Sequence, residues 1–408
     1  MRERFICGLD IGTSKIAASI ASVDKKGKIS LIAIEESMSR GISRGLVTDL
    51  ALLSNTIQET MRNLGKKSSI KPDDIYAGIK GIHLSCRHSQ AIIPLIERDN
   101  KIITSLDIKR VNHQARLLGL DLEEEVIHEF PQNYSIDGDG NKVENPLGLY
   151  AHKLGVDLFL IIGKVNQIEN LIKAINNAGC SIRKLIFSGL AASFVTLEEE
   201  EKKSGSCLIN IGAGSTEILT FQGGVLRDLE ILPIGGINLT ERIASNLKIP
   251  FELAEELKIS YAAATTKDIE GDEDILVKKS SFYNPIRRRD ICLAVEPQVN
   301  SLIDSIKERI DNSAFRKFFN SGVVITGGTS LLYGFLEQLE SRLFLPVRLA
   351  KIKQSSLPST KGPIYATTIG LLYFGIHSFL SNGSLFNKGK AGAGRFVNRI
   401  AELYHEYF

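Results

Sequence analysis

Two short apolar runs near the start of the chain are separated by a polar turn that contains glycine. The runs are Phe5–Leu9 and Ile16–Ala21, and Asp10–Lys15 forms the turn. Such runs around a Gly/Ser/Thr turn predict a β-hairpin. The turn also combines backbone N–H groups, hydroxyls and an ammonium with a carboxylate, which suits a phosphate and Mg²⁺. On its own this signal is weak, because Gly-Thr-Ser turns are common in ordinary hairpins.

The same pattern returns in Cys207–Phe221, again as two apolar runs around a Gly/Ser/Thr loop. Asp10 then corresponds to Asn210, and Gly12 corresponds to Gly212. Each copy is followed by another turn and another strand-like run. A duplicated hairpin predicts two similar domains that face each other and hold the phosphates of a nucleotide between two glycine loops.

A third segment, Gly322–Leu339, predicts a strand, a Gly-Gly turn and the start of a helix. Glycines at such a turn let the backbone approach a ligand closely. The three segments, in this order, resemble the ATPase superfamily of actin, heat-shock chaperones and sugar kinases. GLDIGTSK resembles its first phosphate loop, NIGAGSTE its second and ITGGTSLLYG its adenosine motif. Gly189–Leu197 and Ala294–Ile306 resemble its two connecting helices.

Several further segments resemble the bacterial cell-division family FtsA, and together they cover most of the chain. They are GLDIGTSK, SRGISRGLVTD, DDIYAGIKGIHL, VIHEFPQNYSIDG with NPLG, GLAASFVTL and LAVEP. Residues 84–164 carry their own strand and helix pattern where that family has an extra subdomain. The resemblance implies an α/β, two-lobed actin-like fold of duplicated ribonuclease H-like domains, with an FtsA-type inserted subdomain and a C-terminal amphipathic helix.

The motifs divide the chain into lobes, an insertion and a tail. We expect 1–83 and 165–203 to form the first actin-like lobe (1A), 84–164 the inserted subdomain (1C), 204–235 and 320–380 the second lobe (2A), 236–319 subdomain 2B, 381–394 a flexible linker and 395–408 an amphipathic helix. The pattern further predicts a strand pair over His83–Pro94, a helix over Val165–Ile182 and a solvated acidic link over Glu198–Lys203. Ile364–Leu380 predicts a buried helix rather than a membrane span, because it is short and contains Thr and His.

The superfamily resemblance implies a site for ATP and Mg²⁺ between the lobes, with Asp10 holding Mg²⁺ through water. The ATP-binding residues that it implies are Asp10, Gly12, Thr13, Ser14 and Lys15 in the first loop, Asn210, Gly212, Ala213, Gly214, Ser215 and Thr216 in the second, and Gly235, Gly236, Asn238, Glu255, Lys258, Gly327, Gly328 and Thr329 around the sugar and base. Glu255 and Lys258 are three residues apart on one predicted helix face, so a plain surface ion pair is the alternative.

Two positions depart from the superfamily pattern and affect the predicted chemistry. The second phosphate loop usually begins with Asp, and here Asn210 stands there. An amide can hold a water but cannot take its proton. The first connecting helix begins with Ser188 and Gly189, where several actin-like ATPases have Gln or Glu. We therefore predict ATP binding with slow or absent hydrolysis, and we assign no catalytic residue.

Composition narrows the classes of protein but identifies none. The 408 residues, 43% hydrophobic and 24% charged, are typical of a globular protein large enough for more than one domain. A net charge of +3 does not favour nucleic acid as a partner. Five scattered cysteines, none in a CxxC pair, predict a reducing cytoplasmic environment and no zinc site. Charged residues before the first short apolar run predict that no signal peptide opens the chain.

The tail of the chain shows the clearest helical amphipathicity. After the Gly/Ser/Lys-rich segment 381–394, residues 395–408 place apolar and polar side chains on opposite faces of a helix. The apolar face includes Phe396, Val397, Ile400, Leu403, Tyr404, Tyr407 and Phe408. A tethered amphipathic helix suits a membrane surface or a partner groove, and the alternative is docking on its own domain. The FtsA resemblance implies the cytoplasmic face of the cell membrane.

The FtsA resemblance also implies partners. Members of that family polymerise, bind the acidic C-terminal peptide of the tubulin-like protein FtsZ and meet other division proteins through the inserted subdomain. Arg287, Arg288 and Arg289 lie in the region that corresponds to the peptide site, with Arg288 aligned best; the alternative is a solvated turn. The implied function is an ATP-binding filament that anchors FtsZ at the division site.

Two other classes stay open at this point. One is a pilus-assembly scaffold of the PilM type, which would not need the tethered helix. The other is a small-molecule kinase of the same superfamily, which would need a catalytic carboxylate where Asn210 stands.

Overall fold

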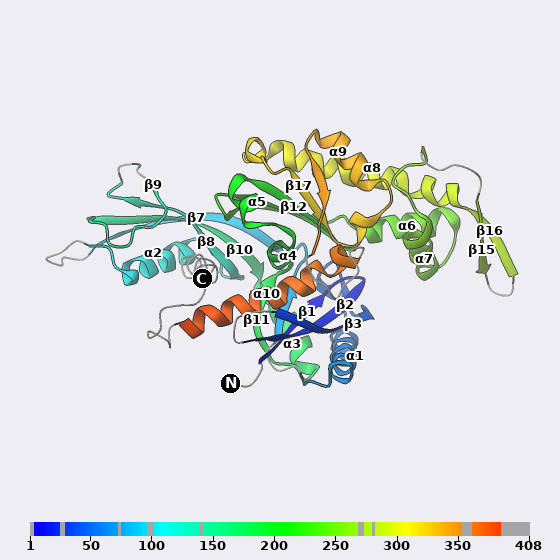
Figure 1. Ribbon diagram of the computed structural model, residues 1–408, viewed down its shortest axis with the longest axis horizontal. Coiled ribbons are helices and arrows are strands. Elements are labelled where there is room, and N and C mark those ends of the chain that lie inside the picture. Colours follow the sequence, from blue (N-terminus) through cyan, green and yellow to red (C-terminus); the bar gives the residue numbers. More distant parts are fainter. Residues whose placement is uncertain are drawn as a thin grey trace.

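The computed structural model describes residues 4–24, 29–71, 75–95, 102–138, 140, 142–267, 273–279, 282–352 and 361–384. Two five-stranded sheets lie at its centre (Figure 1). The first, in the order β11-β6-β1-β2-β3, contains β1 (Arg4–Ile11), β2 (Lys15–Val23), β3 (Ile29–Met38), β6 (Ile75–Ile79) and β11 (Ile182–Phe187). The second, in the order β14-β13-β12-β17-β18, contains β12 (Ser206–Ile211), β13 (Thr216–Gln222), β14 (Val225–Leu232), β17 (Val323–Thr326) and β18 (Val347–Leu349).

Helices surround these sheets. They are α1 (Leu50–Ser68), α2 (Ser105–Leu118), α3 (Val165–Asn177), α4 (Ser188–Thr196), α5 (Glu199–Ser204), α6 (Gly236–Leu247), α7 (Phe251–Tyr261), α8 (Arg288–Asn312), α9 (Phe335–Leu343) and α10 (Gly362–Ser384), with the 3-10 helices η1 (Arg316–Phe318) and η2 (Gly328–Leu331). Two small hairpins complete this part, β4 (Ile42–Ser43) with β5 (Leu46–Val47) and β15 (Asp274–Lys279) with β16 (Phe282–Arg287).

The two central sheets have the same construction. In each, three consecutive strands pair antiparallel, and two later strands extend the edge of the first strand in parallel. Asp10 lies opposite Ala17 in the first hairpin, as Asn210 lies opposite Glu217 in the second. The predicted duplication of one α/β unit is therefore confirmed.

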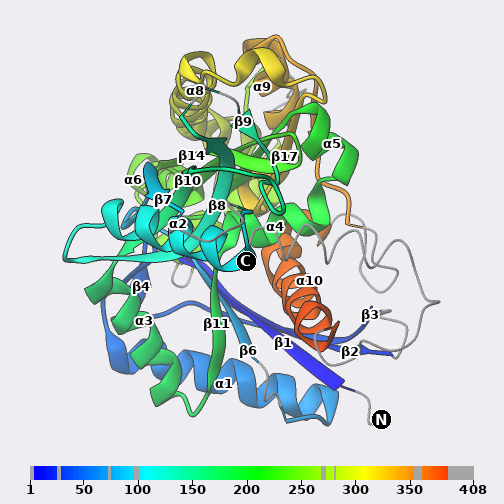
Figure 2. The ribbon, with the colours of Figure 1, turned by 90° about the vertical axis from the view of Figure 1, so that its left-hand side faces the viewer.

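Helices cover both faces of the first sheet, with α1 and α3 on one side and α10 on the other (Figure 2). The alternation of side chains along β1 explains this arrangement. Leu9 and Ile11 point into the core shared with α1 and α3, and Ile6 packs with α10 on the opposite face. The helix predicted to reach Ile182 is shorter, because α3 ends at Asn177 and Ile182 begins β11, the edge strand of this sheet.

The inserted subdomain is a sheet with one helix against it, at one end of the molecule (Figure 1). Its strands, in the order β7-β10-β8-β9, are β7 (Leu84–Pro94), β8 (Glu124–Ile136), β9 (Lys142–Val143) and β10 (Lys153–Lys164). The strand pair expected over His83–Pro94 is wrong: one long strand pairs with β10 along its whole length. α2 begins where Thr104 and Asp107 form a capping box, which satisfies its first free N–H groups.

Two helices cross between the halves of the molecule. α4 follows β11 of the first sheet but also packs against β12 and β13 of the second. Conversely, α10 follows β18 of the second sheet and packs against β1 and β2 of the first. The helices contact each other so closely that a Cβ on Gly370 of α10 would lie 1.9 Å from the carbonyl oxygen of Ala191 in α4. A tight helix crossing thus joins the two lobes.

The assignment of Ala294–Ile306 as the second connecting helix is wrong, because that role belongs to α10. Ala294–Ile306 lies in α8, which packs against α6 and α9 and buries its apolar side in the core of the second half. The buried helix predicted over Ile364–Leu380 is confirmed by α10, in which Leu371, Leu372 and Phe374 are fully buried. None of the helices in the described part of the chain is long and apolar enough to cross a bilayer.

The acidic run Glu198–Lys203 is not a solvated link, because most of it folds into α5. The Glu201 carboxylate accepts three hydrogen bonds from the guanidinium of Arg348, which lies in β18. Lys202 is buried, and its ammonium pairs with Glu199 at 3.0 Å and lies over the Phe194 ring. Glu201 therefore connects α5 to the second sheet, and Lys202 connects α5 to α4.

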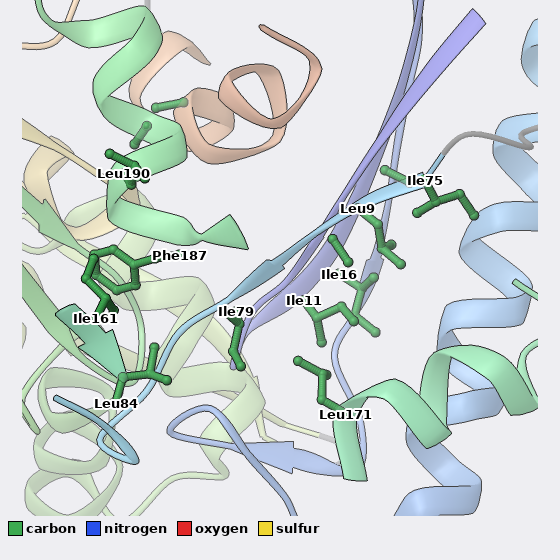
Figure 3. Packing of buried hydrophobic residues seen from close by; sticks show 14 of the residues in the cluster. Leu9, Ile11, Ile16, Ile75, Ile79, Leu84, Ile161, Leu171, Phe187 and Leu190 are labelled. Atoms are coloured by element: carbon green, nitrogen blue, oxygen red, sulfur yellow. The ribbon is translucent and has the colours of Figure 1, made fainter. Parts of the chain in front are cut away.

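One hydrophobic core continues from the first sheet into the inserted subdomain and the second sheet. Figure 3 shows Leu84 and Ile161 of the insertion beside Phe187, at the end of β11. Polar contacts add to this packing, since Gln132 of β8 donates to the Leu226 carbonyl and accepts from Arg227 of β14. The insertion is consequently attached to both lobes. The tail helix predicted over 395–408, and all of the linker beyond Ser384, lie outside the described residues, whereas α10 extends into the first part of that linker.

Candidate nucleotide-binding site

A cavity of about 700 Å³ lies where the carboxyl ends of β1 and β12 approach each other. Most of the residues predicted to bind ATP line it. They are Asp10, Gly12, Thr13, Ser14, Lys15, Asn210, Gly212, Ala213, Gly214, Ser215, Gly236, Glu255, Lys258, Gly327, Gly328 and Thr329.

Three predicted residues are not among the described residues that line the cavity, and they support its walls instead. Thr216 is buried in β13, where its hydroxyl donates to the Ile234 carbonyl at 2.8 Å. The Asn238 side chain accepts from the Gly235 N–H at 3.0 Å and so satisfies a free donor at the start of α6. These contacts hold the turn between β14 and α6 beside the second phosphate loop.

The two glycine turns at the cavity are each closed by an equivalent internal hydrogen bond. The Gly12 N–H donates to the Lys15 carbonyl at 2.9 Å, and the Gly212 N–H donates to the Ser215 carbonyl at 3.0 Å. The turns also lie against each other, because a Cβ on Gly214 would come within 2.5 Å of the Thr13 hydroxyl. Two equivalent backbone turns therefore flank one end of the cavity, as the duplicated pattern predicted.

Asp10 shares its end of the cavity with a lysine that sequence reasoning missed. The Lys80 ammonium donates to Asp10 Oδ1 at 2.7 Å. β6 runs parallel to β1 with Gly78 beside Asp10, so Lys80 emerges at the same end of the sheet. The parallel pairing of the two strands could have indicated this position.

Glu217 is a second missed residue, and it places a carboxyl group beside Asn210. The Asn210 amide donates to Glu217 Oε2 at 2.9 Å. Glu217 is almost fully buried, and this burial raises the pKa of its carboxyl to about 7, while the nearby charge of Lys80 acts in the opposite direction. A carboxyl group with this pKa can exchange protons near neutral pH. The second loop therefore lacks the usual Asp but has an acidic group within one hydrogen bond.

Polar atoms without a partner also gather here. Among the residues that the structure describes, Ser188 Oγ and Glu217 Oε1 are buried with no hydrogen-bond partner. A Cβ on Gly78 would lie 2.9 Å from Ser188 Oγ and 3.4 Å from Asp10 Oδ1, which places the serine near Asp10. Buried polar groups normally have partners. These atoms are suited to contact water or a ligand.

Lys15, which the resemblance placed on the phosphates, has its own partners in this structure. Its ammonium lies 2.8 Å from Glu36 Oε2 and 4.1 Å from the centre of the Tyr365 ring. The Tyr365 hydroxyl donates to the same Glu36 oxygen at 3.0 Å. These contacts connect the first phosphate loop with β3 and α10.

The Glu255–Lys258 pair forms as predicted, with 2.6 Å between Nζ and Oε2. Lys258 also donates to the Thr240 hydroxyl at 2.9 Å and the Gly236 carbonyl at 3.1 Å, so it ties α7 to the start of α6. Burial lowers the pKa of Lys258, and Glu255 opposes that shift. The neighbouring wall is largely apolar and comprises Leu239, Ile259, Leu331, Leu332 and Tyr333.

The adenosine motif closes this wall. Gly327 has a φ of +90°, and a Cβ there would lie 2.3 Å from the Ile211 carbonyl oxygen, so only glycine fits without strain. The Thr329 hydroxyl donates to the Gly212 carbonyl at 3.0 Å, which connects the motif to the second phosphate loop. An apolar wall with a few fixed polar groups is the usual setting for a planar ligand.

The basic trio lies at the β16–α8 junction. Arg287 and Arg289 are exposed. Arg288 is partly buried and lines the cavity edge, where its Nε donates to the Tyr261 carbonyl at 3.1 Å and its Nη1 lies 3.5 Å from Glu273 Oε2. Arg288 thus contacts its own chain, whereas its two neighbours face solvent.

These residues fit a nucleotide with Mg²⁺. The paired backbone turns suit phosphate oxygens, and the apolar wall with Glu255 and Lys258 suits a sugar and base. Among the described residues, no group of three or more His, Cys, Asp and Glu could hold a metal alone. Mg²⁺ commonly uses one or two carboxylates together with phosphate oxygens and water, and Asp10 is placed for that.

Family models and a sequence relative point to one family. A family model described as "Cell division protein FtsA" matches residues 207–370, and one described as "SHS2 domain inserted in FTSA" matches residues 81–162. The "Cell division protein FtsA" of Pseudomonas aeruginosa is 31% identical over 378 residues, which cover 91% of this chain and 89% of the relative.

Solved structures share the fold at lower identity. A chain of the "PilM-PilN type IV pilus biogenesis complex" has a TM-score of 0.65 at 18% identity and covers 91% of this chain and 98% of its own. MreB5 of Spiroplasma citri, described as bound to ADP, has a TM-score of 0.55 at 12% identity and covers 92% of this chain and 98% of its own. These likenesses confirm the actin-like fold. The two family models and the relative from Pseudomonas aeruginosa show that the chain belongs to the FtsA family of bacterial cell-division proteins.

Proposed function

We propose that this protein is an ATP-binding, actin-like filament former that anchors FtsZ filaments to the cytoplasmic face of the membrane at the division site. The observation that carries the proposal is the cavity between two equivalent glycine turns, beside Asp10, in a chain of the FtsA family. The tail helix at 395–408 would supply the membrane anchor. The inserted subdomain would meet other division proteins and copies of the same chain.

The nucleotide part of the proposal assigns roles to residues around the cavity. Asp10 would hold Mg²⁺ through water, and the two glycine turns would contact the phosphates with their N–H groups. Mg²⁺, when bound, would neutralise part of the triphosphate charge. The similar fold of a protein solved with ADP, MreB5, supports a nucleotide here. Calorimetry with ATP and Mg²⁺ tests this directly, and a protein that binds no nucleotide would refute it.

We expect hydrolysis to be slow or absent. Asn210 cannot accept a proton, and Glu217 is buried and bonded to Asn210. Rapid phosphate release by the purified protein would contradict this expectation and direct attention to Glu217.

Membrane anchoring predicts that one charge on the apolar face of the tail removes binding to vesicles. Burying a large apolar side chain gains about 1.5–3 kcal/mol, and about 1.4 kcal/mol corresponds to a tenfold change in affinity. Ile400→Asp is therefore expected to weaken sedimentation with anionic liposomes at least tenfold. Asn398→Asp adds the same charge to the polar face and should change binding less than threefold. Equal effects of both variants would exclude insertion of the apolar face.

Binding of the tail helix to the membrane should also depend on polymerisation of the protein. Ordering a tail residue costs about 1 kcal/mol, so one helix alone binds lipid weakly. Several helices on one filament bind together, because each raises the effective concentration of the next. Liposome binding is expected to rise steeply with protein concentration at the onset of polymerisation.

If the basic trio binds the FtsZ peptide, the affinity for that peptide should depend on the charge of these arginines. Charge reversal at Arg288 should abolish binding of an acidic FtsZ C-terminal peptide, but it also removes the contacts with Tyr261 and Glu273. The double variant Arg287→Glu/Arg289→Glu changes the exposed charges and leaves those contacts in place. We expect this double variant to lower the affinity for the peptide at least tenfold, as measured by fluorescence anisotropy. Unchanged affinity in both variants would place the peptide elsewhere.

A further inference from the structure

The ion pair between Lys80 and Asp10 is unusual for its surroundings. The side chains are only 19% and 9% exposed, so the pair is largely removed from water. A buried pair of this kind adds little to stability, because both charges lose hydration. Yet both residues line the cavity, at the end where the glycine turns meet. The pair therefore needs an explanation other than the fold.

The Lys80 ammonium also lies against the first phosphate loop. A Cβ on Gly12 would be 3.4 Å from Lys80 Nζ. The ammonium therefore lies near the first glycine turn, on the side that a Gly12 side chain would occupy. An ammonium carries three N–H donors, and the bond to Asp10 uses one of them.

Lys15 is less well placed for the same task. Its ammonium is paired with Glu36 at 2.8 Å and lies over the Tyr365 ring. The Lys15 ammonium is held at Glu36 and the Tyr365 ring, whereas the Lys80 ammonium lies beside Asp10 and near Gly12. Of the two lysines, Lys80 is the one directed at the carboxylate predicted to face Mg²⁺.

We propose that Lys80 is a tethered cation of the nucleotide site, which donates directly to the triphosphate and so makes part of ATP binding independent of Mg²⁺. The inference rests on the proposed nucleotide function. Before nucleotide arrives, Lys80 neutralises Asp10. With nucleotide bound, its ammonium contacts phosphate oxygens, and Asp10 is released to orient the water shell of Mg²⁺.

Calorimetry with ATP, in Mg²⁺ and in EDTA, tests this role. The unaltered protein should lose less than tenfold in affinity when Mg²⁺ is removed. Lys80→Met should lose at least a further tenfold in EDTA and less in Mg²⁺, and Lys80→Arg should stay within threefold of the parent. Lys361→Met is the matched control, since it removes another lysine charge from the cavity lining at an exposed position.

A second pair of variants separates phosphate contact from simple neutralisation of Asp10. In EDTA, Asp10→Asn should bind ATP more tightly than the parent, because a negative charge is gone and Lys80 remains. The double variant Asp10→Asn/Lys80→Met has no unpaired buried charge and lacks only the lysine donor, so it should bind ATP at least tenfold more weakly than Asp10→Asn. Equal affinities of Asp10→Asn and the double variant would overturn direct contact, as would equal affinities of Lys80→Met and the parent in EDTA. A parent protein that binds no ATP in either buffer would overturn the proposed function as well.

Discussion

Replacing Gly370 with alanine is expected to lower the free energy of unfolding by about 3 kcal/mol. The added Cβ would lie 1.9 Å from the Ala191 carbonyl oxygen and 2.4 Å from its carbon, so two helix backbones would have to separate. No rotamer relieves such a contact, because both partners are main-chain atoms. Urea unfolding followed by circular dichroism measures the change.

Gly65→Ala is the matched control for this substitution. Gly65 lies in α1, where the nearest atom to an added Cβ is the Ile70 carbonyl oxygen at 3.6 Å. Alanine is favoured over glycine within helices by about 1 kcal/mol, so this variant should be more stable than the parent. If both variants changed stability in the same direction, the close crossing of α4 and α10 would not be the cause.

Replacing Glu217 with glutamine is expected to stabilise the protein in a pH-dependent way. The pKa of the carboxyl is about 7 in the folded protein and 4.5 ordinarily, so folding disfavours its charged form. The contribution of this group to stability is fully present below pH 4.5 and is lost as the pH rises through 7. Glutamine keeps the shape and cannot ionise. At pH 8, Glu217→Gln should gain about 3 kcal/mol over the parent, since each pKa unit corresponds to about 1.4 kcal/mol.

The pH profile of that difference is the decisive measurement. At pH 5 the gain should shrink to below about 1 kcal/mol, because the parent carboxyl is then mostly protonated when folded. Exposed Glu308→Gln serves as a control and should show no such profile. An equal gain in stability at pH 5 and pH 8 would contradict the explanation that burial of the ionised Glu217 carboxylate destabilises the parent.

Local pattern was sufficient for the elements that carry the phosphate loops. The short apolar runs around Asp10–Lys15 and around the Asn210 loop predicted both hairpins, because short apolar runs on either side of a turn are visible in the sequence itself. The equivalence of Asp10 and Asn210 followed from the same alignment. Turn chemistry and the apolar pattern therefore predicted the duplicated hairpins, whereas most of the cavity lining followed from the resemblance to the actin-like superfamily.

Tertiary partners of helices could not be predicted in the same way. α8 and α10 both have long apolar stretches, and an apolar stretch alone does not predict which helix it packs against. Only the close packing of Gly370 on Ala191 identifies α10 as the partner of α4. For a similar reason Lys202 looked like part of a solvated run, although the Phe194 ring covers its ammonium.

The two site residues that the sequence analysis missed, Glu217 and Lys80, differ in how far the sequence could have predicted them. Glu217 lies directly opposite Asn210, so the hairpin register itself contained this information. Lys80 requires knowing that β6 pairs with β1, which joins segments far apart in the sequence. Long-range pairing of strands, rather than local propensity, decides which side chains share the cavity.

The crossing of α4 and α10 is not the only connection between the lobes, because the inserted subdomain also packs against both of them. The β15–β16 hairpin lies at the opposite end of the long axis from that subdomain (Figure 1). A given rotation displaces a point in proportion to its distance from the axis. A small rotation of the second lobe on these two connections would therefore move the hairpin further than it moves the walls of the cavity.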